Sequence, residues 1–444
     1  MSYLDNILFA ILLVIGFGYF FNSVKKIRRN INLGTDVNRY DNPKARWNNM
    51  AMIALGQSKM VKRPIAGILH IIVYLGFIII NIELLEIIID GLFGTHRIFA
   101  FLGTIYNVLI ASFEILAVLV LVSVFIFWIR RNVIKLKRFI NSDLNGFPKN
   151  DANYILYFEV VLMTLFLLMN ASDLHLQNVP GGFSHFIKAG SFPISQFIEP
   201  IFNGMSNESV MLLTEIFWWL HIVGILIFMN YLYFSKHLHI LLAFPNTYFA
   251  NLNPLGEFDN LESVTKEVKL MMDPNADPFA AVPVDENAVP SKFGASDIQD
   301  LNWVQLLNAY TCTECGRCTS VCPANITGKK LSPRKIMMDT RDRMEEVGKN
   351  IDANKGVFIP DNKSLLNDYI TPEELWACTS CNACVEECPV NISPLSIIMD
   401  MRRYLVMEQS AAPLPLNAMM TNIENNGAPW QFNQQDRLNW KEEN

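Results

Sequence analysis

Long apolar runs dominate the first part of the chain. Five stretches approach or exceed the roughly 20 residues that a helix needs to cross a bilayer: Tyr3–Phe21, Ile65–Ile89, Phe99–Ile129, Ile155–Asn170 and Val210–Phe234. The fourth is the shortest. The first has no basic start and no small-residue cleavage site after it, unlike a secretory signal peptide. The pattern predicts a bundle of five transmembrane helices.

The pattern changes after the last apolar run. Residues 251–300 are acidic, contain several prolines and show little periodicity, which predicts an extended strap. A docking surface for a partner is the alternative, and the Met and Phe side chains favour a strap that packs on protein. Two later segments, "SPRKIMMDTRDRMEEVG" and "SPLSIIMDMRRYLVMEQ", have helical patterns with the same Ser-Pro start.

Between these two segments, "TPEELW" predicts a further helix start. Thr371 has the position of an N-cap, Pro372 is the first helical residue, and Glu374 completes a capping box. The expected fold is therefore mainly α. Its parts are a transmembrane bundle (1–250), a linker (251–300), an α-helical ferredoxin-like domain (301–410) and a tail (411–444).

Composition narrows the range of functions. The formal net charge of −6 argues against nucleic acid as a partner, because nucleic acid favours basic surfaces. All 8 cysteines lie in two short runs, so none remains for a disulfide elsewhere. This usage indicates a reducing compartment and metal binding. The sequence contains no phosphate-binding glycine loop and no H-E-x-x-H motif.

Basic residues predict the orientation. The segments "KKIRRN", "KMVKRP", "RRNVIKLKR" and "SKH" all lie on one side of the membrane if the N-terminus is outside. We therefore expect a multi-pass protein of a bacterial-type inner (cytoplasmic) membrane whose cysteine-containing part is cytoplasmic. The redox argument from the cysteines leads independently to the same side.

The two cysteine runs carry the most specific chemical signal. "CTECGRCTSVCP" and "CTSCNACVEECP" both follow the pattern C-x2-C-x2-C-x3-C-P, in which three thiolates bind one [4Fe–4S] cluster and the fourth binds the other. Zinc sites use well-separated pairs of ligands and fit this spacing poorly. Gly316 would permit a close approach of the backbone to a cluster. The predicted ligand sets are Cys312, Cys315, Cys318 and Cys388 for one cluster, and Cys378, Cys381, Cys384 and Cys322 for the other.

Histidines within the apolar runs suggest a second cofactor. His70 lies inside the second run, where an ionisable ring is costly. His221 and His239 are eighteen residues apart on what we expect to be one continuous helix, so both would point the same way, about 27 Å apart. Two imidazoles on facing helices are able to hold a haem iron. The alternative is that these histidines are interfacial or hydrogen-bonded.

The remaining histidines are expected at surfaces. We predict His237 as an interfacial neighbour of Lys236, and His175 and His185 as surface residues of the outer loop. His96 is ambiguous, because it begins the third apolar run on the side where His221 would need a partner.

With these residues, 1–250 resemble the γ subunit of nitrate reductase and the membrane subunit of heterodisulfide reductase. In that family the second and fifth helices hold b-type haems, so the resemblance implies a haem on His70 and His239 near the cytoplasm. The family pattern has another histidine ten residues after the first, where this chain has Ile80. An outer haem would then need His221 together with His96, or less readily His175, or the outer site is empty. The resemblance implies one or two haem b groups.

The second half also resembles known families. Residues 300–410 are similar to the iron–sulfur domains of the heterodisulfide reductase, glycolate oxidase and succinate dehydrogenase families. The tail "MTNIENNGAPWQFNQQDRLNWKEEN" resembles the segment that joins such a domain to a cysteine-rich catalytic part, and the sequence has no CCG motif. The resemblance implies a separate, cytoplasmic, cysteine-rich (CCG-type) partner subunit that docks partly on this tail. A disordered end is the alternative.

These features predict an oxidoreductase subunit without catalytic residues of its own. It would pass electrons between diffusible quinone and the partner, through b-type haem and two [4Fe–4S] clusters. The alternatives are an electron-transfer subunit of a larger assembly with other respiratory subunits, and a haem-free anchor for a ferredoxin. Several carboxylates are candidates for a proton path to quinone or for simple helix caps and histidine partners: Glu83, Glu86, Glu114, Glu159 and Glu215.

Overall fold

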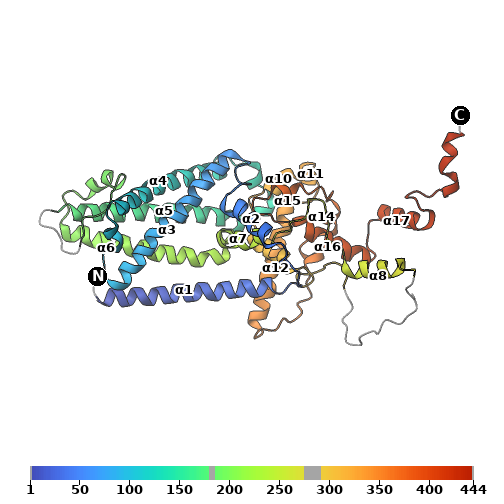
Figure 1. The fold of residues 1–444 in the computed structure, drawn as a ribbon, viewed down its shortest axis with the longest axis horizontal. Coiled ribbons are helices and arrows are strands. Elements are labelled where there is room, and N and C mark those ends of the chain that lie inside the picture. The colour runs from blue at the N-terminus through green and yellow to red at the C-terminus, as the bar shows by residue number, and fades with distance from the viewer. Residues whose placement is uncertain (1–2, 180–185, 275–291, 443–444) are drawn as a thin grey trace.

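The computed structural model describes residues 3–179, 186–274 and 292–442. The molecule is elongated, with a bundle of long helices at one end and a helical head at the other (Figure 1). The described residues form helices joined by turns and irregular loops, and their β-structure is limited to two isolated bridges. The bundle consists of α1 (Tyr3–Ile31), α3 (Pro64–Phe93), α4 (Thr104–Asn132), α5 (Phe147–Gln177) and α6 (Asn207–Tyr231).

The predicted bundle is confirmed, since all 5 of these helices are long and apolar enough to cross a membrane. The fourth predicted span is the middle of a helix of 31 residues. Polar residues near both ends of α5 hid its length, and both find partners within the protein. Asp151 accepts a hydrogen bond from the Tyr231 hydroxyl, and Asp173 pairs with Arg97.

The predicted continuous helix through His221 and His239 is wrong. α6 ends at Tyr231, and Ser235 is extended, with ψ 147°. A 3₁₀ turn, Lys236–Leu238, follows before α7 (His239–Tyr248) begins. The Ser235 hydroxyl accepts from the His237 amide, and Asp151 of α5 accepts from the Lys236 amide. These side chains satisfy the amides that the break releases, so the helical spacing argument does not apply to His239.

The head is built from short helices around a buried apolar core. Its starts confirm the sequence prediction: Thr371 and Glu374 form a reciprocal capping box, and Ser332 and Ser393 cap the helices that open with Ser-Pro. The helices of the head are α9 (Trp303–Thr311), α10 (Arg317–Val321), α11 (Pro323–Ile326), α12 (Pro333–Ala353), α13 (Leu365–Asp368), α14 (Pro372–Trp376), α15 (Ala383–Glu387) and α16 (Pro394–Met407).

The connecting segments are more helical than expected. The described part of the predicted strap contains α8 (Glu262–Met272), and the rest of the predicted strap between 275 and 291 lies outside the described residues. The tail contains α17 (Leu414–Asn426) and a 3₁₀ helix (Gln434–Lys441), which extend away from the head (Figure 1). The short α2 (Pro43–Met50) packs beside α7 between bundle and head.

Buried polar contacts fasten the head to the bundle. The Arg334 side chain of α12 is completely buried, and its Nε donates to Asp143 in the α4–α5 connection at 3.1 Å. At the end of α1, Asn30 donates to the Tyr310 hydroxyl at 2.8 Å. A buried guanidinium is very costly unless it is paired, so this junction strongly favours one arrangement of the two parts.

Candidate electron-transfer centres

The two cysteine runs form loops with the same backbone. In the first loop Glu314 and Gly316 have positive φ, and in the second Ser380 and Asn382 have it at the equivalent positions. A short helix begins directly after each loop, α10 at Arg317 and α15 at Ala383. Positive φ is uncommon outside glycine and asparagine, so its repetition at both positions shows that the shared spacing imposes one loop conformation.

Five of the predicted ligands line one cavity: Cys384 of the other predicted set, and the four that we call the first thiol group, Cys312, Cys315, Cys318 and Cys388. They come from both runs, as the interlocking pattern requires. The Ile392 amide donates to the sulfur of Cys388 at 3.3 Å. Burial raises the pKa of the Cys312 thiol to about 12. Such a thiol loses its proton readily only when a metal takes the proton's place.

The other predicted set, which we call the second thiol group, also gathers: Cys322, Cys378, Cys381 and Cys384. Burial, with the neighbouring Cys378, Cys322 and Cys381 thiols, raises the pKa of Cys384 to about 12. The Ser380 amide donates to the Cys378 sulfur at 3.4 Å. Among the described residues, no three His, Cys, Asp or Glu side chains converge tightly enough for a single metal ion.

The two thiol groups have different surroundings. Each group has two buried cysteines, Cys312 and Cys388 in the first and Cys322 and Cys384 in the second, and the second group alone has an exposed one, Cys381. The loop of the first group faces the connections at the head end of the bundle, because Arg317 donates to the Lys59 carbonyl of the α2–α3 connection at 3.2 Å and Arg138 of the α4–α5 connection lies against Gly316. The first group therefore adjoins the helices, and the second reaches the surface of the head.

His70 and His239 lie together at the head end of the bundle. Their ring centroids are 6.4 Å apart, and the rings are tilted by 38°. Two imidazole nitrogens at about 2.0–2.1 Å from one metal place the ring centres roughly 6 Å apart. The His239 Nδ1 lies 3.0 Å from the Lys236 carbonyl, to which it donates when protonated there, leaving Nε2 for a metal. Buried His70 Nδ1 has no hydrogen-bond partner in the structure. The pair fits an iron held between two imidazoles.

Lys236 connects this histidine pair to the first thiol group. Its carbonyl orients His239, and its ammonium group pairs with the carboxylate of Glu314, between Cys312 and Cys315. The Glu314 pKa stays below its usual value because Lys236 and Arg341 outweigh the cost of burial. His237 lies nearby, its ring centroid 5.4 Å from that of His239. Sequence reasoning missed Glu314 and Lys236, and nothing in the local pattern marks them.

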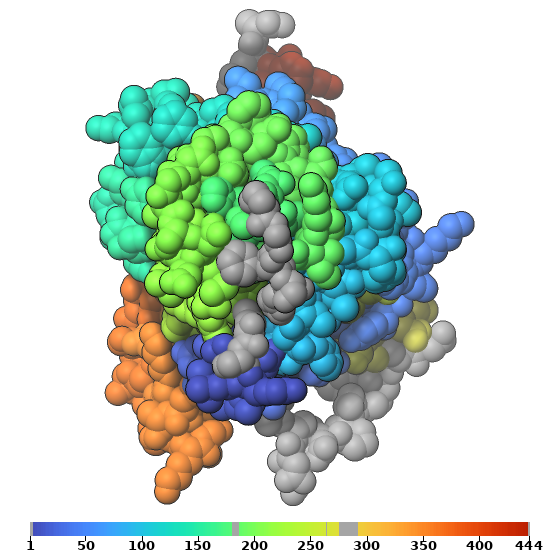
Figure 2. Space-filling model, turned by 90° about the vertical axis from the view of Figure 1, so that its left-hand side faces the viewer, coloured from blue at the N-terminus to red at the C-terminus, as the bar shows by residue number. Residues whose placement is uncertain are grey.

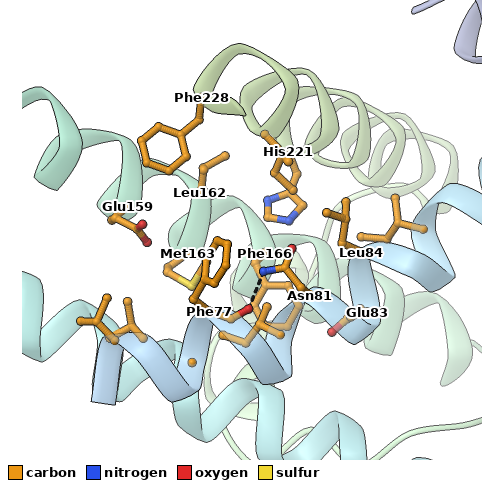
Figure 3. A pocket seen from close by; sticks show the side chains of 16 residues that line it. Phe77, Asn81, Glu83, Leu84, Glu159, Leu162, Met163, Phe166, His221 and Phe228 are labelled. Carbon is orange, nitrogen blue, oxygen red and sulfur yellow. Dashed lines mark hydrogen bonds between the residues drawn. The ribbon is translucent and has the colours of Figure 1, made fainter. Parts of the chain in front are cut away.

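His221 lies in a separate cavity between α3, α4, α5 and α6. Its imidazole points from α6 into this cavity, with Glu83 toward one end and Glu159 toward the other (Figure 3). The His221 side chain is buried, and its Nδ1 has no hydrogen-bond partner in the structure. Ile80 of α3 also lines the cavity. The lining contains no second histidine among the described residues.

The candidate partners of His221 are engaged elsewhere. The Nε2 of His96 is 2.9 Å from Asp173, and its Nδ1 accepts from the Ile187 amide at 3.3 Å. The Nδ1 of His175 is 2.6 Å from Glu199. Neither residue lines the His221 cavity, so the structure does not form the predicted pairing. His185 lies outside the described residues.

The predicted candidate carboxylates are mostly occupied. Glu86 accepts from the Tyr106 hydroxyl and the Phe99 amide, and Glu114 accepts from the Ser195 amide. Glu83 differs, because its buried Oε2 has no hydrogen-bond partner in the structure. Glu83 lines both the His221 cavity and a second, polar cavity at the far end of the bundle, which Glu215 also lines.

Comparison with known proteins supports the interpretation of the head. Residues 311–392 match the family model of a 4Fe-4S dicluster domain. A probable membrane-anchored ferredoxin of Chromohalobacter salexigens is 34% identical over 36% of this chain and 25% of its own length. No solved structure matches.

Two relatives align with most of the chain. A probable iron–sulfur-binding oxidoreductase of Bacillus subtilis is 30% identical over 87% of this chain and 54% of its own length. An EtfAB:quinone oxidoreductase of Syntrophomonas wolfei is 24% identical over 98% of this chain and 59% of its own length. The chain thus spans little more than half the length of these relatives.

Components of heterodisulfide reductases are also among the relatives. One of them, from the dihydromethanophenazine:CoB–CoM heterodisulfide reductase of Methanosarcina mazei, is 28% identical over 32% of this chain and 35% of its own length. The resemblance to heterodisulfide reductase is confirmed. The chain is related to electron-transfer iron–sulfur oxidoreductases. Its 5 candidate spans are those of a membrane protein.

Proposed function

We propose that this protein passes electrons between quinone in the membrane and a cytoplasmic oxidoreductase partner. The carriers are a b-type haem held by His70 and His239, a cluster on the first thiol group and a cluster on the second. The 6.4 Å between the two imidazole centroids carries the proposal, since it matches two rings that share one metal. The haem and clusters supply one-electron steps.

The chain's own residues keep these centres in order. The Lys236 carbonyl holds the His239 ring in place, while its side chain holds the loop of the first thiol group through Glu314. On α3, Gly67 packs so closely that a Cβ there would come within 2.8 Å of the Met60 carbonyl. Arg317 of the same loop donates to Met60 as well as Lys59. Contacts therefore connect the histidine pair to the first loop. The exposed Cys381 of the second thiol group lies at the other end of the proposed electron path.

Quinone and the partner are supported less directly. The relative named EtfAB:quinone oxidoreductase supports quinone as the membrane substrate. The heterodisulfide reductase components among the relatives support a multi-subunit complex. We propose a cysteine-rich, CCG-type partner and a cytoplasmic head with the N-terminus outside. The tail offers Trp430, Phe432 and Trp440, which are 44%, 68% and 70% exposed, as apolar contacts for that partner.

Cofactor content tests the carriers. We expect purified protein to contain about eight iron atoms in clusters and to show a b-type band in its reduced-minus-oxidised spectrum. His70→Leu and His239→Leu should remove that band and leave the cluster iron, because the thiol groups do not depend on the imidazoles. His175→Leu is a matched control that should keep the haem. A wild-type protein without the band would support the haem-free anchor instead.

Deletion of residues 420–444 tests the partner. The shortened protein should keep its haem and clusters but lose a co-purifying cysteine-rich subunit. Retention of that subunit at full yield would contradict docking through the tail. Co-purification of membrane complexes without any soluble subunit would favour the alternative of a larger respiratory assembly.

A further inference from the structure

The bundle contains two histidine sites that differ in one respect. At the head end, His70 of α3 faces His239, and the rings are 6.4 Å apart. Deeper in the bundle, His221 of α6 faces a cavity to which α3 contributes Ile80, ten residues after His70. A metal between His221 and α3 would therefore have one imidazole and a hydrocarbon side chain opposite it. The residues at His221 do not fit a second iron held by two imidazoles.

The cavity has instead the features of a site for a lipid-dissolved ring. Its wall is mostly apolar, with Leu84, Leu162 and Phe166 among its lining residues. Phe77 is 44% exposed and also lines it, so the cavity reaches the lipid-facing side of α3. Inside, the buried His221 Nδ1 and Glu83 Oε2 have no hydrogen-bond partner among the residues that the structure describes. Unpaired buried polar atoms are costly, and a ligand with polar groups on an apolar ring would satisfy them.

We infer that the His221 cavity binds the head group of quinone in the place where a second haem would need another histidine. A ring nitrogen of His221 hydrogen-bonds a quinone oxygen. The inference rests on the proposed electron path, which ends at His70 and His239. Quinone takes up two electrons, delivered one at a time from that side, and two protons, and becomes quinol. Quinol oxidation returns both electrons and both protons along the same routes.

Glu83 provides the proton route. It lines the His221 cavity and also the polar cavity at the far end of the bundle, together with Glu86, Asp90 and His96. Figure 2 looks onto this end, where the α3–α4 connection (cyan) and the α5–α6 segments (green) meet. Arg97 is occupied there by Asp173 and the Tyr106 hydroxyl. Protons thus reach the site through Glu83 from the end of the bundle opposite the head, while electrons reach it from the His70 and His239 side.

Binding of a naphthoquinone with one prenyl unit to the purified full chain tests the site. His221→Leu should weaken binding at least tenfold and leave haem at one per chain. Ile80→His should raise haem to two per chain and abolish probe binding, because it supplies the missing imidazole. Ile78→His, at an exposed position of α3 outside the cavity, is the matched control and should keep both one haem per chain and the affinity. Two haems in the wild type, or unchanged binding in His221→Leu, would overturn the inference.

The proton route needs a separate measurement. Glu83→Gln should bind the probe within threefold of wild type, yet its haem should be reduced by the quinol form at least tenfold more slowly. Glu208→Gln, an exposed carboxylate outside both cavities at the same end, should behave as wild type. Equal rates in Glu83→Gln and wild type would refute the route. A wild type without haem would refute the proposed electron path, and probe binding alone would then decide the site.

Discussion

The two cysteine loops have one backbone and two environments. Both place positive φ at the same two positions, yet the second of these is Gly316 in one loop and Asn382 in the other. A Cβ on Gly316 would come within 2.6 Å of the Arg334 guanidinium and 3.1 Å of the Arg138 carbonyl. Asn382 carries a side chain at the equivalent position. The cysteine spacing sets the local conformation, and the residue in the turn reports whether another part of the protein covers the loop.

This difference indicates which of the two cysteine loops packs against the rest of the protein. The covered loop contributes to the first thiol group, beside the bundle, and the uncovered loop includes exposed Cys381. Variants that expose the first loop should therefore damage the protein far more than matched variants of the second.

The largest effect is expected from Arg334→Met. It leaves the Asp143 carboxylate buried without its cation, and breaking a buried pair costs about 3–5 kcal/mol. The head should then separate from the bundle at lower denaturant concentration. Hydrogen exchange of α12 in detergent measures this, with Arg402→Met, a partly buried arginine beside the second loop, as the comparison. Equal loss in both variants would contradict the asymmetry.

Exchange of the turn residues should have the next largest effect. Gly316→Asn pushes a side chain against Arg334 and the Arg138 backbone, a clash that costs roughly 1–3 kcal/mol, and the first cluster should be lost. Asn382→Gly should change stability by about 0.5–1 kcal/mol, through the flexibility of the unfolded chain. Cluster content by electron paramagnetic resonance distinguishes the two loops. Loss of both clusters in Asn382→Gly would contradict the comparison.

Loss of a helix cap beside either loop should have a smaller effect than exchange of the turn residues. Thr371→Ala removes the cap of α14, which leads into the second loop, and should cost about 1 kcal/mol. Ser332→Ala removes the cap of α12 but also a hydrogen bond to Asp143, so its cost should be larger. Thermal unfolding of the head measures both variants, and Thr371→Ser should restore most of the loss.

The smallest effect is expected at the exposed edge of the contact between head and bundle, which we call the rim. The Lys62–Glu386 pair is about half exposed on both sides, so Lys62→Met should change stability by no more than about 1 kcal/mol. High salt should reduce that difference further, because exposed charges are screened. Unfolding at two salt concentrations tests this, and a larger, salt-independent loss would show that the rim contributes to the junction.

Local signals in the sequence predicted those helices and helix caps that depend only on residues close by in the chain. The apolar runs identified the 5 candidate spans, and "TPEELW" identified its capping box. The break at Ser235 escaped prediction, because Asp151 of another helix accepts the Lys236 amide. The pairing of His70 and His239 was implied by resemblance, and the structure places the two rings together despite the break.

Other parts of the centres had no local signal. Glu314 adopts positive φ between two cysteines and meets Lys236, which lies far away in the sequence. The pairing of Arg334 with Asp143 likewise joins a head helix to a connection between spans. Such contacts depend on how the domains dock, and periodicity within one segment carries no information about docking.

The buried Arg334 also bears on how the protein is made. A fragment restricted to residues 292–442 would lack Asp143 and the Arg138 carbonyl, which cover and pair the Arg334 guanidinium in the full chain. We therefore expect the iron–sulfur part to be a poor candidate for expression as a soluble fragment. During synthesis the spans emerge first, and the first loop then matures against a surface that already exists. We therefore expect the membrane part to supply the surface on which the first loop of the head folds.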